Sequence, residues 1–137
     1  MDLKKYAAGK IAITIENISR NRTTQISYPT SVEELSILTK AIPDIDFTLD
    51  IGHCVQNGES FQDFLTSNVA HIKDIHLHNA ENKGRAHFGL NKKGGVDVVG
   101  ILRLLKKIKY NGFLTLEILD FDETVASWEM ITNIAQH

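Results

Sequence analysis

The chain has 137 residues, of which 42% are hydrophobic and 23% charged, as expected for one ordinary globular domain with its own core. Its 15 Lys and Arg against 17 Asp and Glu leave a net charge of −2, so no electrostatic argument favours nucleic-acid or anionic-membrane binding. Cys54 is the only cysteine, which excludes an intrachain disulfide and favours a reducing cytoplasm. The sequence predicts neither a signal peptide nor a membrane span.

The chain begins with a lead-in over residues 1–10, followed by a predicted strand over residues 11–17. Isoleucines alternate there with small or polar residues, which gives the strand one apolar and one polar face. Glu16 lies on the polar face, at the end of the strand. A polar loop is predicted over residues 17–30.

A helix and a second strand follow. Ser31 and Glu34 form a capping box that begins the helix, and Pro43 ends it. The strand covers residues 46–50, with Asp50 at its end on the polar face.

Gly52 is predicted to permit a sharp turn after this strand, which would bring His53 back beside Asp50. A short helix is predicted over residues 60–66, where phenylalanine and leucine side chains form an apolar side.

The third strand, over residues 72–79, has the most informative pattern. Asp74, His76 and His78 share one face, and two imidazoles so close together are a natural pair of metal ligands or catalytic groups. Two surface histidines at a sheet edge are the alternative. The long polar loop over residues 80–95 has a length typical of functional or disordered segments.

Asp97 is predicted to cap a helix that ends near Lys109. Residues 113–119 form the fourth predicted strand, with Glu117 on its polar face, and Asp122 opens the last helix. The predicted inward side of that helix consists of Val125, Trp128, Ile131 and Ile134.

Strands that alternate with helices favour β/α units and a parallel sheet. Each strand here has only one strongly apolar face, which suits a barrel with helices outside and a polar interior better than an open sheet covered on both faces. Active sites of such barrels lie at the carboxyl ends of the strands. The polar residues that fall at these ends are Glu16, Asp50, His76, His78 and Glu117.

Glu16, Asp50, His76 and Glu117 supply three carboxylates and one imidazole. Carboxylates held close together repel one another unless a cation lies between them, and Mn²⁺, Mg²⁺, Co²⁺ or Zn²⁺ suits this ligand set. The alternative is a group of buried carboxylates paired with Arg or Lys. No predicted strand carries an inward Lys or Arg in its upper half.

Five segments resemble the xylose-isomerase-like TIM barrels, also called AP endonuclease family 2, which include sugar isomerases, sugar epimerases and endonuclease IV. Residues 15–17, 49–53, 75–78 and 116–118 are similar to motifs of the last four strands of these barrels. Residues 87–97 are similar to the family's His-x-x-Leu-Gly-x-Gly-x-x-Asp signature. The resemblance covers nearly the whole chain and implies a half-barrel, with residues 1–137 forming a single domain.

By this resemblance, Glu16, Asp50, His76 and Glu117 would bind one divalent metal. Glu16 and Glu117 would also form the acid/base pair that moves a proton beside a carbonyl.

The resemblance also implies substrate contacts. His53 would contact substrate, and Arg85 is a weaker counterpart of a substrate-binding arginine in the family. His87 matches a loop histidine that binds zinc in endonuclease IV, and we assign it to substrate here. His78 points inward by its position in the strand, as a substrate contact or as support for a ligand.

The chain departs from endonuclease IV, because Arg85 stands where a zinc-binding Asp would be and the first-half histidines of a trinuclear site are absent. A complete barrel needs about 250 residues, so only strands five to eight are represented. A half-barrel exposes its inner face and two sheet edges, which favours association. We therefore expect a homo-oligomer, such as a dimer of facing half-barrels; a fragment of a longer gene product is the alternative.

Three functions remain open from the sequence. The first is a metal-dependent isomerase or epimerase acting on a sugar or sugar phosphate. The second is a non-enzymatic or degenerate half-barrel that binds metal or forms oligomers. The third is a DNA-repair nuclease, which the charge balance and the missing ligands make the weakest.

Overall fold

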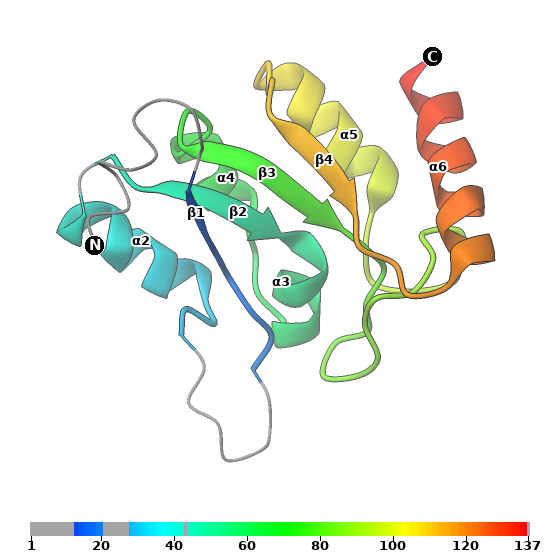
Figure 1. Ribbon diagram of the computed structural model, residues 1–137, viewed down its shortest axis with the longest axis horizontal. Helices are drawn as coiled ribbons and strands as arrows, with labels where there is room; N and C mark the ends of the chain where they lie inside the picture. Colours follow the sequence, from blue (N-terminus) through cyan, green and yellow to red (C-terminus); the bar gives the residue numbers. More distant parts are fainter. Residues whose placement is uncertain (1–12, 21–27, 43, 137) are drawn as a thin grey trace.

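The computed structural model describes residues 13–20, 28–42 and 44–136. Four parallel strands form one open sheet in chain order (Figure 1). The strands are β1 (Thr14–Glu16), β2 (Asp46–Asp50), β3 (Ile72–Leu77) and β4 (Phe113–Leu116). This arrangement is half of a β/α barrel, as predicted. The lead-in over residues 1–10, the first two residues of the first predicted strand and Pro43 lie outside the described residues.

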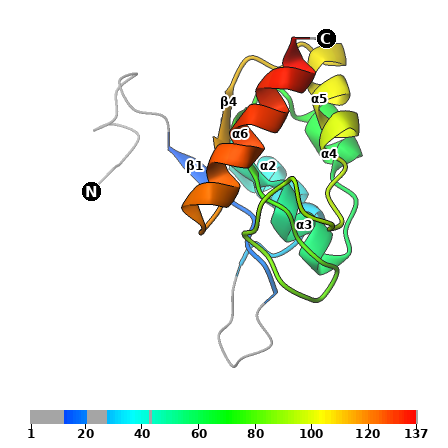
Figure 2. The ribbon, with the colours of Figure 1, turned by 90° about the vertical axis from the view of Figure 1, so that its right-hand side faces the viewer.

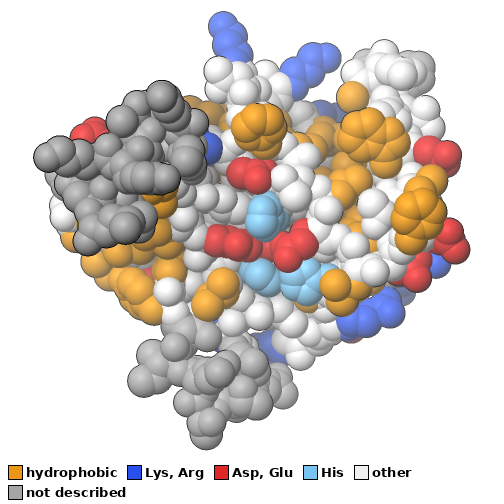
Figure 3. Space-filling view, in the orientation of Figure 1, with side chains coloured by type: hydrophobic (Ala, Val, Ile, Leu, Met, Phe, Trp, Pro, Cys, Tyr) orange, Lys and Arg blue, Asp and Glu red, His pale blue; other side chains and the backbone are white. Residues whose placement is uncertain are grey.

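The helices are α2 (Val32–Ala41), α3 (Ile51–Asn57), α4 (Gln62–Ser67), α5 (Val98–Lys107) and α6 (Phe121–Ala135). Helices α2 to α5 lie on one side of the sheet, and α6 stands beside β4 at its edge (Figures 1 and 2). The opposite face of the sheet, which would line the interior of a barrel, is open to view (Figure 3). The polar sides of all four strands point to this open face.

The predicted starts of α2 and α5 are confirmed, and α4 begins at Gln62, two residues after the predicted start. Short polar side chains at the starts of α2 and α5 satisfy backbone N–H groups that have no partner within the helix. Ser31 and Glu34 form the capping box of α2, and Asp97 accepts from the backbone N–H of Gly100 at the start of α5. Helix α6 begins slightly earlier than predicted, with Asp120 as its N-cap.

The predicted turn at Gly52 is wrong, because β2 runs directly into helix α3. The Asp50 carboxylate caps this helix by accepting from the backbone N–H of His53 at 2.6 Å, so His53 does lie beside Asp50. Gly58, at a φ of 72°, ends the helix in the left-handed conformation that favours glycine. Gly52 is small for another reason: a Cβ there would overlap the ring of His78.

The core lies between the sheet and helices α2 to α5. The outer-face residues of β2 and β3 are fully buried, namely Phe47, Leu49, Ile75 and Leu77. Phe47 packs edge to face on Phe64 of α4, with ring centroids 5.6 Å apart. Helix α6 departs from expectation, since Trp128 is 62% exposed and Ser127 is buried instead. It follows the last strand of the sheet, and no further strand lies beside β4 among the described residues.

Candidate metal centre

Four side chains meet at the carboxyl end of the sheet, each from a different strand. Glu16 ends β1, Asp50 ends β2, His76 lies near the end of β3 and Glu117 directly follows β4. One ligand atom of each lies within 4.8 Å of the others. In Figure 3 acidic and histidine side chains gather in the middle of the open face. The structure therefore brings together the four residues predicted to bind one metal ion.

The carboxylates converge on one nitrogen of His76. Its Nδ1 lies 3.2 Å from Glu16 Oε1, 3.0 Å from Glu117 Oε2 and 4.0 Å from Asp50 Oδ2. The hydrogen bond to Glu16, reinforced by the charges of Glu16, Glu117 and Asp74, outweighs burial and raises the pKa of His76 to about 9. In the metal-free protein a protonated imidazole thus supplies the positive charge that the carboxylates attract. Three carboxylate oxygens and one imidazole nitrogen fit a divalent cation at the same place.

We call Glu16, Asp50, His76 and Glu117 the quartet. Asp50 is its most tightly held member. Its carboxylate is fully buried and lies 3.2 Å from Nε2 of His78 and 3.3 Å from Nδ1 of His53. Burial alone would raise the pKa of Asp50, but the hydrogen bond from His78 and the charges of His53 and His78 hold it below its usual value. Asp50 is therefore an ionised carboxylate in a fixed position, as a metal ligand would need to be.

His78 supports Asp50 from below rather than facing the open side, because its side chain is completely buried. Nδ1 of His78 lies 3.0 Å from the backbone N–H of His87 and 3.1 Å from the backbone oxygen of Asn79, and Nε2 lies 3.3 Å from Oδ2 of Asp50. Burial opposes protonation, but the contact with Asp50 raises the pKa of His78. A substrate on the open face would meet Asp50 before His78.

His53 and His87 lie beside the quartet, and their Nε2 atoms are 3.3 Å apart. Nδ1 of His53 lies 3.0 Å from the backbone oxygen of Asn17, and Nδ1 of His87 lies 3.9 Å from Oε1 of Glu117. His87 has a φ of 59°, a left-handed conformation uncommon for a residue with a side chain. Its backbone N–H bond to His78 accompanies this conformation.

The nitrogens of His53, His78 and His87 also lie within 4.8 Å of one another. The rings of His78 and His87 are stacked, with centroids 4.0 Å apart and planes 27° apart. Because imidazole binds metals in the plane of its ring, stacked rings direct their nitrogens side by side instead of toward a common point. Both nitrogens of His78 also have partners already, so we interpret this cluster as hydrogen-bonded support for the quartet.

Arg85 is exposed, and its guanidinium lies 4.1 Å from the centre of the Phe88 ring. Among the described residues, no hydrogen bond or ion pair joins its side chain to the quartet. The loop over residues 80–95 is ordered in part by Asn79, whose amide donates to the backbone oxygen of Lys92 at 2.8 Å. Gly94 passes so close to this amide that a Cβ there would overlap it.

Sequence reasoning did not identify the supporting roles of Asn17 and Asn79. The Asn17 side chain accepts from the backbone N–H of Asp50 at 2.8 Å and donates to the backbone oxygen of Asp50 at 2.9 Å. It thus continues the pairing of β1 with β2 beyond the last backbone pair and fixes Asp50. The available signal was an asparagine directly after a strand that ends in a candidate ligand.

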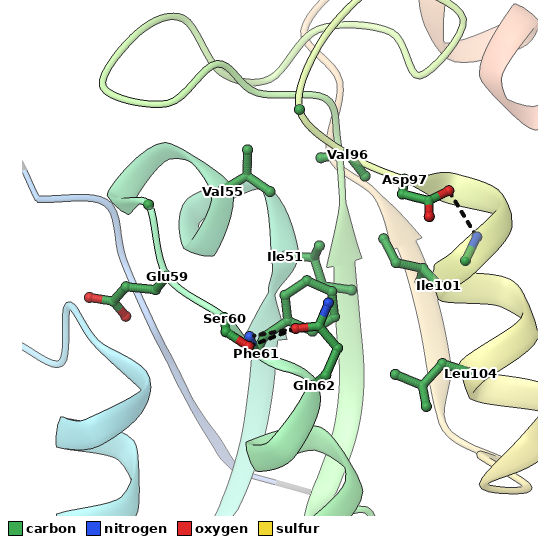
Figure 4. A pocket seen from close by; sticks show the side chains of 13 residues that line it. Ile51, Val55, Glu59, Ser60, Phe61, Gln62, Val96, Asp97, Ile101 and Leu104 are labelled. Atoms are coloured by element: carbon green, nitrogen blue, oxygen red, sulfur yellow. Dashed lines mark hydrogen bonds between the residues drawn. The ribbon is translucent and has the colours of Figure 1, made fainter.

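A separate cavity of about 700 Å³ lies on the helix side of the sheet and contains no quartet residue. Ile51, Phe61, Ile101 and Leu104 provide much of its apolar wall (Figure 4). Glu59 at its border forms an ion pair with Arg20. The cavity is mainly a groove between helices, separate from the polar face.

Fold and site together define a β/α half-barrel with a cluster of carboxylates and imidazole that can hold a metal ion. The model of the xylose isomerase-like TIM barrel family matches residues 2–133, and the chain belongs to this family. None of the curated proteins compared with the chain matches it.

Solved structures agree with the fold. A D-tagatose 3-epimerase-like protein has 22% identity and a TM-score of 0.79, and the match covers 98% of this chain and 51% of that one. D-psicose 3-epimerase from Clostridium cellulolyticum H10 has 15% identity and a TM-score of 0.68, with 96% and 52% covered. An AP endonuclease, family 2, from Brucella melitensis has 12% identity and a TM-score of 0.71, with 93% and 48% covered. The chain thus spans about half the length of these proteins.

No helix in the described ranges combines the length and the apolar character that crossing a bilayer requires.

Proposed function

We propose that this chain carries the metal and proton-transfer centre of a divalent-metal-dependent isomerase or epimerase that acts on a sugar or sugar phosphate. The observation that carries the proposal is the position of Glu16 and Glu117. They come from the two outer strands, β1 and β4, and approach the same nitrogen of His76 at 3.2 and 3.0 Å. Two carboxylates at one cation site suit proton removal and return at a carbon beside a carbonyl.

The protein's own groups would divide the work as follows. Glu16 and Glu117 exchange the proton with the substrate carbon, and both side chains are accessible from the open face, with 33% and 43% of their surface exposed. Asp50 and His76 hold the cation with them, while His53 lies beside Glu16 and His87 beside Glu117. A bound divalent ion would polarise the substrate carbonyl and so make the neighbouring carbon more acidic.

The D-tagatose, D-psicose and keto-glucoside named for the structural neighbours suggest that a keto sugar is the right substrate class. Each of these compounds has a carbonyl beside a hydroxyl-bearing carbon, which is the arrangement that the two glutamates suit. Arg85 is a further proposed substrate contact, which would require the loop to move it toward the site.

The first test is elemental analysis of protein purified without chelators and without a metal-affinity tag. We expect about one divalent ion per chain in the wild type and its loss in Glu117→Ala, because this change removes one of four ligands. Protein that neither contains nor takes up a divalent ion would rule the proposal out.

The second test is incorporation of deuterium from D₂O into D-tagatose and D-psicose, followed by mass spectrometry. Glu117→Gln should lose exchange, since the amide cannot accept the proton. Glu129→Gln, an exposed change on α6, is the matched control and should retain exchange. Equal exchange in wild type and Glu117→Gln would contradict the assigned role of this glutamate.

A metal-binding module without catalytic activity is the second proposal, and the open inner face favours it. Four strands provide only one wall of a barrel interior, so a sugar bound there would remain exposed to water. Stoichiometric metal without exchange of any ketose would support this alternative.

A further inference from the structure

A second layer of polar side chains lies on the open face of the sheet, one step nearer the amino ends of the strands than the quartet. Because residues alternate between the two faces of a strand, the residue two positions before each quartet member shares its face. These residues are Thr14, Thr48, Asp74 and Thr115. The hydroxyls of Thr14 and Thr48 contact each other at 2.8 Å, and the hydroxyl of Thr115 donates to the carboxylate of Asp74. Asp74 is therefore the one charged member of a layer that otherwise consists of hydroxyls.

Asp74 and the quartet carboxylates approach different nitrogens of the His76 ring. Glu16 and Glu117 lie 3.2 and 3.0 Å from Nδ1, whereas Oδ2 of Asp74 lies 3.6 Å from Nε2. Within the described ranges no other hydrogen bond or ion pair reaches Nε2. The two nitrogens of an imidazole point in different directions, and a neutral ring with an ion at one nitrogen carries its proton on the other. An ion at Nδ1 would thus leave an N–H that faces Asp74.

Thr115 restrains the Asp74 carboxylate from the neighbouring strand. It is paired in register with His76, and its hydroxyl lies 3.0 Å from both Oδ1 and Oδ2 of Asp74. The side chains of Asp74 and His76 are only 25% and 19% exposed, so the contact between them is partly shielded from water. The carboxylate therefore has a defined orientation behind the ring.

A histidine that binds a metal through one nitrogen commonly donates the N–H of the other nitrogen to a carboxylate, which fixes the ring and makes the ligating nitrogen more basic. We propose that Asp74, restrained by Thr115, is a positioning residue that fixes the His76 ring with Nδ1 toward the other three quartet members. This inference rests on the proposed metal centre, and it assigns no chemical step to Asp74.

The first experiment is calorimetric titration of the metal-free chain with Zn²⁺ at one fixed pH. Asp74→Asn should weaken binding about 10- to 100-fold, the usual loss when such a partner is removed. Thr115→Val should also weaken binding, because it frees the Asp74 carboxylate without changing any charge. Thr115→Ser keeps the hydroxyl and should retain wild-type affinity.

Asp46→Asn is the matched control. Oδ1 of Asp46 also faces a histidine ring, at 3.7 Å from Nδ1 of His71, but Asp46 begins β2 and so lies at the opposite end of the sheet from the quartet. This variant loses the same charge and the same kind of contact. Its affinity for Zn²⁺ should remain within about twofold of the wild type.

The second experiment needs no metal, and it separates this inference from the proposed function. At neutral pH the His76 ring of the metal-free protein carries a proton on both nitrogens. An Nε2 proton held against a carboxylate exchanges slowly with water, so the ¹⁵N-edited proton NMR spectrum should contain a downfield Nε2–H signal that is absent from His76→Gln. The signal should persist in Asp46→Asn and disappear in Asp74→Asn.

Three results would overturn the proposal. An Nε2–H signal that survives in Asp74→Asn would mean that Asp74 does not hold the ring. Wild-type affinity in Asp74→Asn would mean that the contact does nothing for the metal. Weak binding in Asp74→Asn together with wild-type affinity in Thr115→Val would mean that Asp74 attracts the cation by charge alone. A wild type that binds no ion would end the proposed function, and the NMR comparison would then decide the role of Asp74 by itself.

Discussion

A divalent cation and the proton of His76 compete for the same carboxylates, so the metal affinity of the centre should depend on pH. The pKa of His76 is raised from 6.5 to about 9, chiefly by its hydrogen bond to Glu16. At neutral pH nearly every ring is protonated, and a metal that takes this nitrogen must displace one proton. Affinity should therefore rise about tenfold per pH unit between about pH 7 and 9 and level off above that range.

The stability of the metal-free protein should change in the opposite direction. A pKa raised in the folded state means that the charged imidazole stabilises the fold fully below its unfolded value of 6.5, and that this contribution is lost as the pH rises through about 9. The difference of pKa corresponds to about 3 kcal/mol, and solvent contact at the open face reduces it to roughly 1–2 kcal/mol.

Calorimetric titration with Mn²⁺ or Zn²⁺ in buffers of different ionisation enthalpy would measure both affinity and proton release. Urea unfolding of the metal-free protein over the same pH range would measure stability. His76→Gln should remove the pH dependence of stability between about pH 6.5 and 9, because an amide does not titrate. Metal affinity independent of pH over this range, with no proton released, would refute the reasoning.

Further predictions concern the support of the site and the core. Gly52→Ala should destabilise the protein by about 1–3 kcal/mol in urea unfolding, because the new methyl group meets the His78 ring. In a His78→Ala background the same change should be neutral or stabilising. Equal losses of stability in both backgrounds would exclude this contact as the cause. Cys54 should resist iodoacetamide until the protein unfolds, because its thiol is only 1% exposed and burial raises the pKa of this thiol. Rapid labelling of the folded protein would contradict the buried position of Cys54. Leu65→Ala should cost about 2–5 kcal/mol in thermal or urea unfolding, since Leu65 is fully buried, and a loss below about 1 kcal/mol would place it outside the core.

The sequence was sufficient to predict which residues meet at the carboxyl end of the sheet. Alternation along a strand decides the face of every residue, and a parallel sheet places all carboxyl ends together. Glu16, Asp50, His76 and Glu117 could thus be grouped without knowing any distance. Their roles in binding and catalysis remain predictions.

Features that depend on distant contacts could not be read in this way. Gly52 looked like a turn residue, whereas its small size leaves room for the ring of His78, which directly follows β3. Trp128 follows helical spacing, but spacing shows only that a helix has an apolar side and not whether a strand is present to receive it. Asn17 acts through bonds to Asp50, whose position depends on the register of β1 and β2.

The quartet draws one residue from every strand, and its outer members belong to the two edges of the sheet. A cation held by Glu16 and Glu117 would act as a cross-link between edges that no backbone hydrogen bond connects. The effect should be greatest for β1, which has only three residues and pairs on one side. Such a cross-link can form only after all four strands have assembled, so metal uptake would report completion of folding. Loss of the metal would first allow β1 to open and to exchange its amide protons with solvent.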